Sequence, residues 1–193
     1  MNAHKNLSVG LVHYPIVDKA GKIVATNVTN LDVHDIARAC RVYGIDSYFV
    51  INPMKEQLMF VSRLLDFWRT GTGRKYNHMR QTALVNVKPA ESIREAVKSL
   101  PKGTRVVGTS AKAESISRTQ NIDLLSFKGF RQELETGATH NLLLFGTGFG
   151  MSEEAFKQCQ AVLEPLRGRP PQDYRHLSVR SAVSICLDRL LGT

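Results

Sequence analysis

The chain has 193 residues, of which 42% are hydrophobic, so it is long enough to bury a core of its own. Charged residues make up 22%, which is too few for general disorder. The formal net charge is +9, from 26 Lys and Arg against 17 Asp and Glu. Because clustered cations gain affinity for phosphates by releasing counterions, nucleic acid is a natural partner. A basic surface without such a partner is the alternative.

Three cysteines, Cys40, Cys159 and Cys186, are widely separated and show no CxxC or Cys/His ligand spacing. All three lie in segments of apolar periodicity, which predicts buried small side chains rather than a disulfide framework or a metal site. No stretch approaches the roughly 20 apolar residues of a membrane span, and residues 1–8 lack the apolar centre of a signal peptide. We therefore expect a soluble, cytoplasmic protein without a metal.

Strand and helix patterns alternate along the first half of the chain. Val33, Ile36 and Cys40 keep helical spacing, and Gly44 is a natural C-terminal stop for that helix. Residues 18–22 form a polar turn. The predicted strands are 7–12, 47–51 and 83–87. One predicted helix runs from near residue 30 to about residue 43, and the other from about residue 55 to about residue 69.

The same alternation continues through the second half. The predicted strands are 105–108, 142–145 and 162–163, and the predicted helices are 92–100, 152–160 and 179–191, with a short strand and a helix near 127–134 between residues 116 and 137. Such alternation is typical of parallel βαβ units, in which helices cover both faces of the sheet. We predict a single α/β domain over residues 1–193, with a mostly parallel sheet and ligands beyond the carboxyl ends of its strands.

A glycine-rich loop, GTGFG at residues 146–150, lies between an apolar strand and a helix. Three glycines in five residues let the backbone turn sharply and approach a ligand closely. The loop has neither the lysine and spacing of a Walker loop nor the third-glycine position of a dinucleotide fingerprint. Glu153 and Glu154 at the start of the next helix would also repel a phosphate. A neutral or cationic ligand is therefore favoured, and S-adenosylmethionine, a sulfonium without phosphate, is such a ligand.

Two further segments sharpen this interpretation. Residues 107–112 form a strand-end loop of small, hydrogen-bonding residues. Residues 174–185 run from a polar loop into a helix whose early turns carry small side chains, which permit close backbone packing. Taken alone, the first is equally typical of a plain turn, and the second of a buried C-terminal helix.

The order of the C-terminal segments resembles that of a known family. LLLFGTGFGMSEE (142–154), LEPLRG (163–168) and LSVRSAVSICLDRL (177–190) look like the three consecutive cofactor motifs of SPOUT methyltransferases. VVGTSAK (106–112) and LDVHDIARACRVYGI (31–45) are similar to the strand-end loop and first helix of the tRNA ribose 2′-O-methyltransferase branch. The resemblance covers nearly the whole chain. It implies S-adenosylmethionine as cofactor, a C-terminal trefoil knot, an obligate homodimer, and tRNA or rRNA as substrate.

The resemblance also implies roles for individual residues. The cofactor-binding residues would be Thr109, Ser110, Gly146, Thr147, Gly148, Gly150, Leu166, Leu177 and Ser178, with the backbone of Leu166 contacting the adenine. Arg38 matches an arginine that contributes to catalysis in the 2′-O branch. Six residues before that arginine the family usually has an asparagine, which is Asp32 here. This departure leaves the methylated atom open between ribose O2′ and a base nitrogen.

Residues 69–88 contain five basic residues and no acidic one, together with Tyr76 and His78 as candidates for base stacking. We predict a flexible RNA-contact loop here, with Arg69, Arg74, Lys75 and Arg80 as its contacts, and a merely solvated loop is the alternative. The leading hypothesis for the chain is an RNA methyltransferase. A catalytically inactive knotted RNA-binding protein is the second, and a nucleotide-binding regulator, which Glu153 and Glu154 disfavour, is the third.

Overall fold

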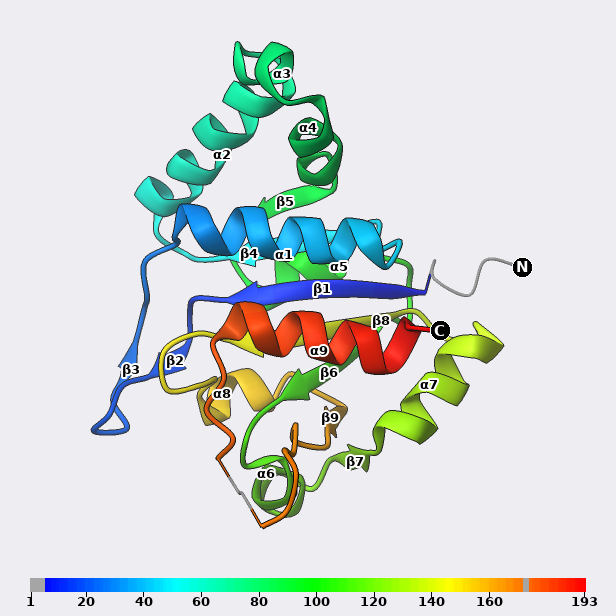
Figure 1. The fold of residues 1–193 in the computed structure, drawn as a ribbon. Coiled ribbons are helices and arrows are strands. Elements are labelled where there is room, and N and C mark those ends of the chain that lie inside the picture. Colours follow the sequence, from blue (N-terminus) through cyan, green and yellow to red (C-terminus); the bar gives the residue numbers. More distant parts are fainter. Residues whose placement is uncertain (1–5, 172–173) are drawn as a thin grey trace.

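A computed structural model of the chain describes residues 6–171 and 174–193, so the first five residues of the predicted 1–193 domain and residues 172 and 173 lie outside it. The described residues form a single α/β domain around a seven-stranded sheet (Figure 1). The strand order is β5-β4-β1-β8-β6-β9-β7, and all neighbouring strands are parallel. The predicted fold class is confirmed, and the trefoil knot stays a prediction.

The elements have the following bounds. The strands are β1 (Leu7–Val12), β2 (Ile16–Val17), β3 (Ile23–Val24), β4 (Tyr48–Ile51), β5 (Val87–Ala90), β6 (Arg105–Thr109), β7 (Asp123–Leu125), β8 (Asn141–Gly146) and β9 (Ala161–Leu163). The helices are α1 (Asn30–Val42), α2 (Lys55–Arg69), α3 (Gly73–Tyr76), α4 (His78–Leu84), α5 (Ile93–Lys98), α6 (Ala113–Gln120), α7 (Phe127–Thr136), α8 (Glu153–Phe156) and α9 (Val179–Leu191). Strands β2 and β3 pair with each other as a separate antiparallel hairpin.

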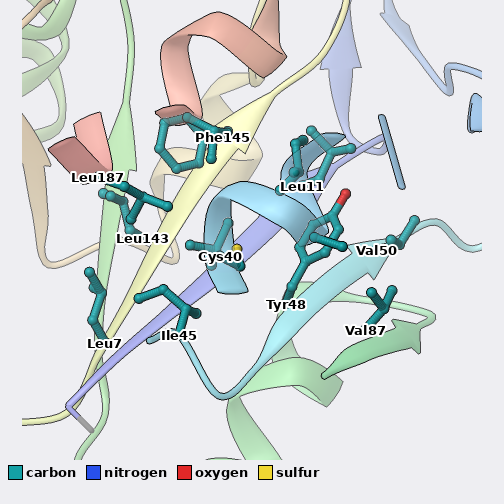
Figure 2. Packing of buried hydrophobic residues seen from close by; sticks show 14 of the residues in the cluster. Leu7, Leu11, Cys40, Ile45, Tyr48, Val50, Val87, Leu143, Phe145 and Leu187 are labelled. Atoms are coloured by element: carbon teal, nitrogen blue, oxygen red, sulfur yellow. The ribbon is translucent and has the colours of Figure 1, made fainter. Parts of the chain in front are cut away.

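The sheet separates two hydrophobic clusters. On one face, α1, α7 and α9 pack against the strands in a cluster that includes Cys40, Tyr48 and Leu143 (Figure 2). On the other face, α5, α6 and α8 cover a second cluster, to which Leu144 and Phe156 belong. Successive residues of β8 thus point to opposite faces, as the pleat of a strand requires. Because both faces are buried, the central strands are continuous apolar runs.

All three cysteines are free and buried, as predicted. Burial raises the pKa of the Cys159 and Cys186 thiols to about 12, so both side chains act as small hydrophobic groups. Among residues 6–171 and 174–193, no cluster of three or more His, Cys, Asp or Glu could hold a metal ion. No helix of this part of the chain is long and apolar enough to cross a membrane.

The segment between α2 and α5 differs from its prediction. The expected flexible loop contains α3 and α4, and the strand expected at 83–87 is the end of α4 followed by β5 at Val87–Ala90. Asn77 explains the helix start, because its side chain accepts a hydrogen bond from the backbone N–H of Arg80 at 2.9 Å. A short apolar run such as 83–87 does not distinguish a strand from a buried helical turn. The helix predicted at 152–160 also ends early, at Phe156.

Candidate functional site

The predicted cofactor segments meet at the carboxyl ends of three neighbouring strands. β8 ends at Gly146, β6 at Thr109 and β9 at Leu163, and parallel strands place these ends along one edge of the sheet. A cavity of about 860 Å³ opens there, within the range of about 300–1,000 Å³ typical of small-molecule sites. The residues predicted to bind the cofactor all line it, namely Thr109, Ser110, Gly146, Thr147, Gly148, Gly150, Leu166, Leu177 and Ser178.

Backbone conformation or lack of space excludes other residues at two glycines of the 146–150 loop, Gly148 and Gly146. Gly148 has a φ of +58°, in the left-handed region. A Cβ atom on Gly146 would lie 2.7 Å from the backbone nitrogen of Met151, too close for any side chain. The chain therefore needs glycine at both positions to fold this loop against the cavity.

Hydrogen bonds fix the loop to the start of the chain. The Thr147 hydroxyl donates to the Val12 carbonyl at 3.1 Å and lies 2.5 Å from the Thr26 hydroxyl. Thr26 Oγ1 in turn lies 2.9 Å from Nδ1 of His13, a fully buried residue. Desolvation lowers the pKa of His13 to about 4, with the charge of Asp32 opposing the shift, so the ring is neutral near pH 7. Sequence reasoning missed His13 and Thr26, which carry no motif.

The other walls of the cavity are also held by internal hydrogen bonds. Thr109 Oγ1 donates to the Leu144 carbonyl at 2.8 Å, and Ser110 Oγ accepts from the backbone nitrogen of Lys112 at 3.1 Å. Ser178 caps α9 by accepting from the backbone nitrogen of Ser181 at 3.2 Å. The polar groups that shape the cavity are thus set before any ligand binds, which lowers the cost of binding.

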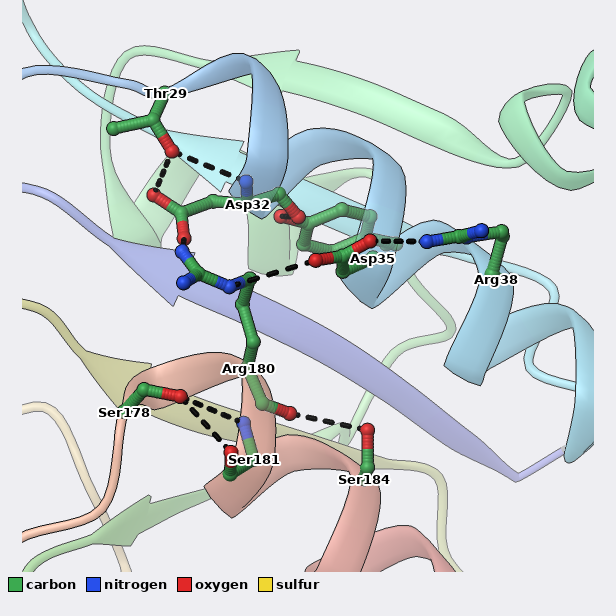
Figure 3. A network of polar contacts seen from close by, with 9 residues as sticks. Thr29, Asp32, Asp35, Arg38, Ser178, Arg180, Ser181 and Ser184 are labelled. Atoms are coloured by element: carbon green, nitrogen blue, oxygen red, sulfur yellow. Dashed lines mark hydrogen bonds and ion pairs between the residues drawn. The ribbon is translucent and has the colours of Figure 1, made fainter.

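The carboxylates that lie at the cavity are not the ones considered in the sequence-based argument. Glu153 and Glu154 do not line the cavity. Asp32 does line it, and it is the one buried carboxylate among residues 6–171 and 174–193, with 6% of its surface exposed. Arg180 of α9 binds it, donating from Nη1 to Asp32 Oδ1 at 2.8 Å (Figure 3). Arg180, like His13, was not anticipated from the sequence.

The predicted catalytic arginine lies outside the cavity. The Arg38 side chain is 59% exposed and forms an ion pair with Asp35 of the same helix. Asp35 also lies 3.5 Å from Nε of Arg180, so the ladder Asp32–Arg180–Asp35–Arg38 leads from the cavity wall to the surface (Figure 3). A single copy of the chain therefore does not bring Arg38 to the cofactor cavity.

The four residues predicted to contact RNA lie together in the α2–α4 lobe (residues 55–84), which stands beyond the edge strand β5 (Figure 1). Their environments differ. Arg69 donates hydrogen bonds to the carbonyls of residues 84, 85 and 87, and the Arg80 guanidinium lies 4.7 Å from the centre of the Trp68 ring. Arg74 and Lys75 are exposed. Of the four predicted contacts, two are therefore exposed cations, while Arg69 is engaged within the fold.

Comparison with known proteins agrees with this geometry. Residues 6–192 match a family described as SAM-dependent RNA methyltransferase. The chain is 38% identical to a tRNA (guanine-N(1)-)-methyltransferase of Nitratidesulfovibrio vulgaris, with 97% of this chain and 42% of that protein aligned. It therefore spans less than half the length of this relative.

Solved structures share the fold. A probable methylase family protein from Haemophilus influenzae superimposes with a TM-score of 0.63 at 19% identity, covering 98% of this chain and 66% of that one. A TrmH/SpoU tRNA modifying enzyme of A. aeolicus superimposes with a TM-score of 0.52 at 18% identity, covering 97% and 74%. These similarities show that the chain shares the fold of these methylase and tRNA-modifying proteins. By its family match over nearly the whole described length, the chain belongs to the SAM-dependent RNA methyltransferase family.

Proposed function

We propose that this chain transfers the methyl group of S-adenosylmethionine to a nucleotide of RNA, with tRNA as the first candidate substrate. One observation carries the proposal: residues from four separate segments, each predicted to bind the cofactor, line a single preorganised cavity. When bound, the cofactor supplies an electrophilic methyl group on a sulfonium. The relatives named as tRNA methyltransferases support tRNA over rRNA.

We assign different parts of the cofactor to different residues of the cavity. The loop 146–150 would form the floor under the adenosine, and Thr109 and Ser110 one side of it. The backbone of Leu166 would contact the adenine, and Leu177 and Ser178 would close the pocket. Because the hydroxyls of Thr109 and Thr147 already bind carbonyls of the protein, we assign them to shaping the site rather than to recognising a phosphate.

A homodimer would explain where Arg38 acts. In one copy the Arg38 side chain does not line the cavity and pairs with Asp35 of the same helix (Figure 3). We propose that the RNA is approached by both subunits, so that Arg38 contributes to the transfer from outside its own cofactor site. Orienting the acceptor for in-line transfer is a main task of such an enzyme, and Arg38→Ala should lower the transfer rate by up to about 100-fold.

The α2–α4 lobe is our proposed RNA-contact surface. Of the four predicted contacts, Arg74, Lys75 and Arg80 remain available to RNA, while Arg69 is bound to carbonyls of the fold. Tyr76 and His78, the residues predicted to stack on unpaired bases, are both exposed among them. We place the enzyme in the cytoplasm, where such RNA is processed.

Two measurements test the proposal. Calorimetry should detect binding of S-adenosylmethionine to the purified chain, and labelled methyl groups should pass to tRNA isolated from cells that lack the gene. Mass spectrometry of nucleosides from cells with and without the gene then identifies the product. Absence of cofactor binding would contradict the proposal, whereas RNA binding without methyl transfer would favour the inactive RNA-binding alternative.

A further inference from the structure

Asp32 places a carboxylate in the wall of the cofactor cavity. The residue is in the first turn of α1, is almost fully buried and lines the cavity. Burying a carboxylate costs free energy unless it is paired and hydrogen-bonded. Burial of the Asp32 carboxylate therefore needs partners that compensate its desolvation. Its position in the cavity wall suggests a role toward whatever binds in the cavity.

The carboxylate retains acceptor capacity toward the cavity. Thr29 Oγ1 donates to Asp32 Oδ2 at 2.6 Å, and Arg180 Nη1 donates to Oδ1 at 2.8 Å (Figure 3). An ionised carboxylate has about four acceptor positions. The contacts found among the described residues use two of them, so lone pairs remain for a partner inside the cavity.

Helix capping alone does not account for this arrangement. Thr29 already caps α1, because its hydroxyl accepts from the backbone nitrogen of Asp32 at 3.1 Å. Arg180 arrives from α9, 148 residues along the chain, and its neighbours Val179 and Ala182 also line the cavity. Two distant segments thus converge to hold one carboxylate at the cavity wall.

We propose that Asp32 accepts the proton that the RNA acceptor loses during methyl transfer, and that Arg180 is a positioning residue that holds this carboxylate. The inference rests on the proposed function. The acceptor atom forms a bond to the methyl carbon, the bond from that carbon to sulfur breaks with its electron pair left on sulfur, and the acceptor proton passes to Asp32. Protonated Asp32 then releases the proton to water before the next turnover.

The chemistry of a carboxylate also selects the class of acceptor. A carboxylate is a weak base, and efficient proton transfer requires a donor of matched acidity. A ring N–H of a nucleobase is much more acidic than a ribose hydroxyl, so Asp32 suits the ring nitrogen. The substrate assigned by this site is a base with a ring N–H, in a nucleotide turned into the cavity.

The test compares Asp32→Asn with Asp188→Asn. Asp188 also joins α9 to α1, through the Tyr43 hydroxyl at 2.9 Å, but it does not line the cavity. We expect D32N to lower kcat by about 100-fold or more and to leave the Kd for S-adenosylmethionine within about threefold, while D188N keeps both values near those of the wild type. Nucleoside analysis of the wild-type product should show a methyl group on a base nitrogen.

The pH profile gives a second readout. The groups around Asp32 are Arg180 from α9, His13 just after β1 and the Tyr48 hydroxyl from β4, and Asp35 of its own helix lies on the other side of Arg180. The pH–rate profile of D32N should differ in shape from that of the wild type, because the variant has no carboxylate to take up the acceptor proton. Should D32N fold poorly, Arg180→Lys keeps the charge and removes the forked donor, and kcat should fall by roughly tenfold with an unchanged product.

The outcomes separate the two claims. A D32N variant that transfers methyl groups at the wild-type rate, or an R180K variant with unchanged kcat, overturns the inference and leaves the proposed function intact. A product methylated on ribose O2′ likewise overturns it. A wild-type chain that methylates no RNA overturns the proposed function, and the inference with it.

Discussion

The hydroxyl of Thr26 lies 2.5 Å from the hydroxyl of Thr147, so a residue just after the β2–β3 hairpin is bound to the glycine-rich loop 121 residues later in the chain. Thr26 also contacts the buried ring of His13 at 2.9 Å. Because Thr147 lines the cavity, this hydrogen bond links the N-terminal segment directly to the floor of the proposed cofactor site.

Removing that link should weaken cofactor binding. Thr26→Val keeps the shape of the side chain and deletes the hydroxyl that joins His13 to Thr147. A lost hydrogen bond that leaves a buried partner unsatisfied costs about 1–3 kcal/mol, so the Kd for S-adenosylmethionine measured by calorimetry should rise by roughly tenfold. Thr136→Val is the matched control, since the Thr136 hydroxyl bonds the Glu133 carbonyl at the exposed end of α7. Equal affinity in T26V and T136V would contradict the role given to Thr26.

Gly148 offers a sharper test of the cavity floor. A Cβ at this position would lie 3.1 Å from Ile16 Cγ2, and the φ of +58° is unfavourable for any side chain. Gly148→Val should therefore abolish detectable cofactor binding. Gly103→Val is the control, because Gly103 has a φ of +81° and open space around it. Both variants carry left-handed strain, and loss of binding in both would show that strain rather than the cavity is responsible.

Periodic segments could be predicted from sequence, while contacts between distant segments could not. Helix α9 begins at Val179 and ends at Leu191, as its spacing indicated. The α4 turn was missed because a short apolar run has no clear period, and because part of its support comes from Arg69, which binds carbonyls up to 18 residues away.

The lining of the cavity could be predicted because the residues concerned lie in four short contiguous segments. Asp32 was visible only as a departure from the family pattern. Its partner Arg180 is 148 residues away, and no local rule connects the two. The direction in which a side chain points across a helix–helix contact is set by packing of the whole domain, so such pairs need the structure.

The buried imidazole of His13 should make stability depend on pH. Its pKa is lowered from 6.5 to about 4 by desolvation, so between these pH values the unfolded chain binds a proton that the folded chain does not. The free energy of unfolding should therefore fall as the pH falls through this window, by up to about 3 kcal/mol once the pH is below the folded pKa.

Urea unfolding between about pH 4.5 and 7.5 measures this slope, and the relevant quantity is the difference between the wild type and His13→Gln. That difference should decrease as the solution becomes more acidic. His78→Gln serves as control because His78 is exposed on α4 and bonds only Gln81 there. If the free energy of unfolding of H13Q depended on pH as steeply as that of the wild type, groups other than His13 would be responsible for the pH dependence.

The α2–α4 lobe allows its structural and RNA-binding cations to be distinguished. Arg69 donates from Nη2 to three backbone carbonyls at 2.6–3.0 Å, and burial lowers the pKa of its guanidinium. Arg69→Met should lower the free energy of unfolding by about 2 kcal/mol, since hydrogen bonds from a charged group contribute about 1.5–3 kcal/mol. Arg74→Ala and Lys75→Ala should leave stability nearly unchanged, because both side chains are exposed.

RNA binding should show the opposite pattern. Each phosphate contact that is lost reduces the slope of log Kd against log salt concentration by about 1, and we expect this reduction for R74A and K75A. R69M should keep the wild-type slope at a temperature where it is folded, because its guanidinium is already bound to carbonyls of the fold. A reduced slope in R69M would place Arg69 on the RNA. Unchanged slopes in both R74A and K75A would mean that RNA binds elsewhere and that the lobe is only a solvated surface.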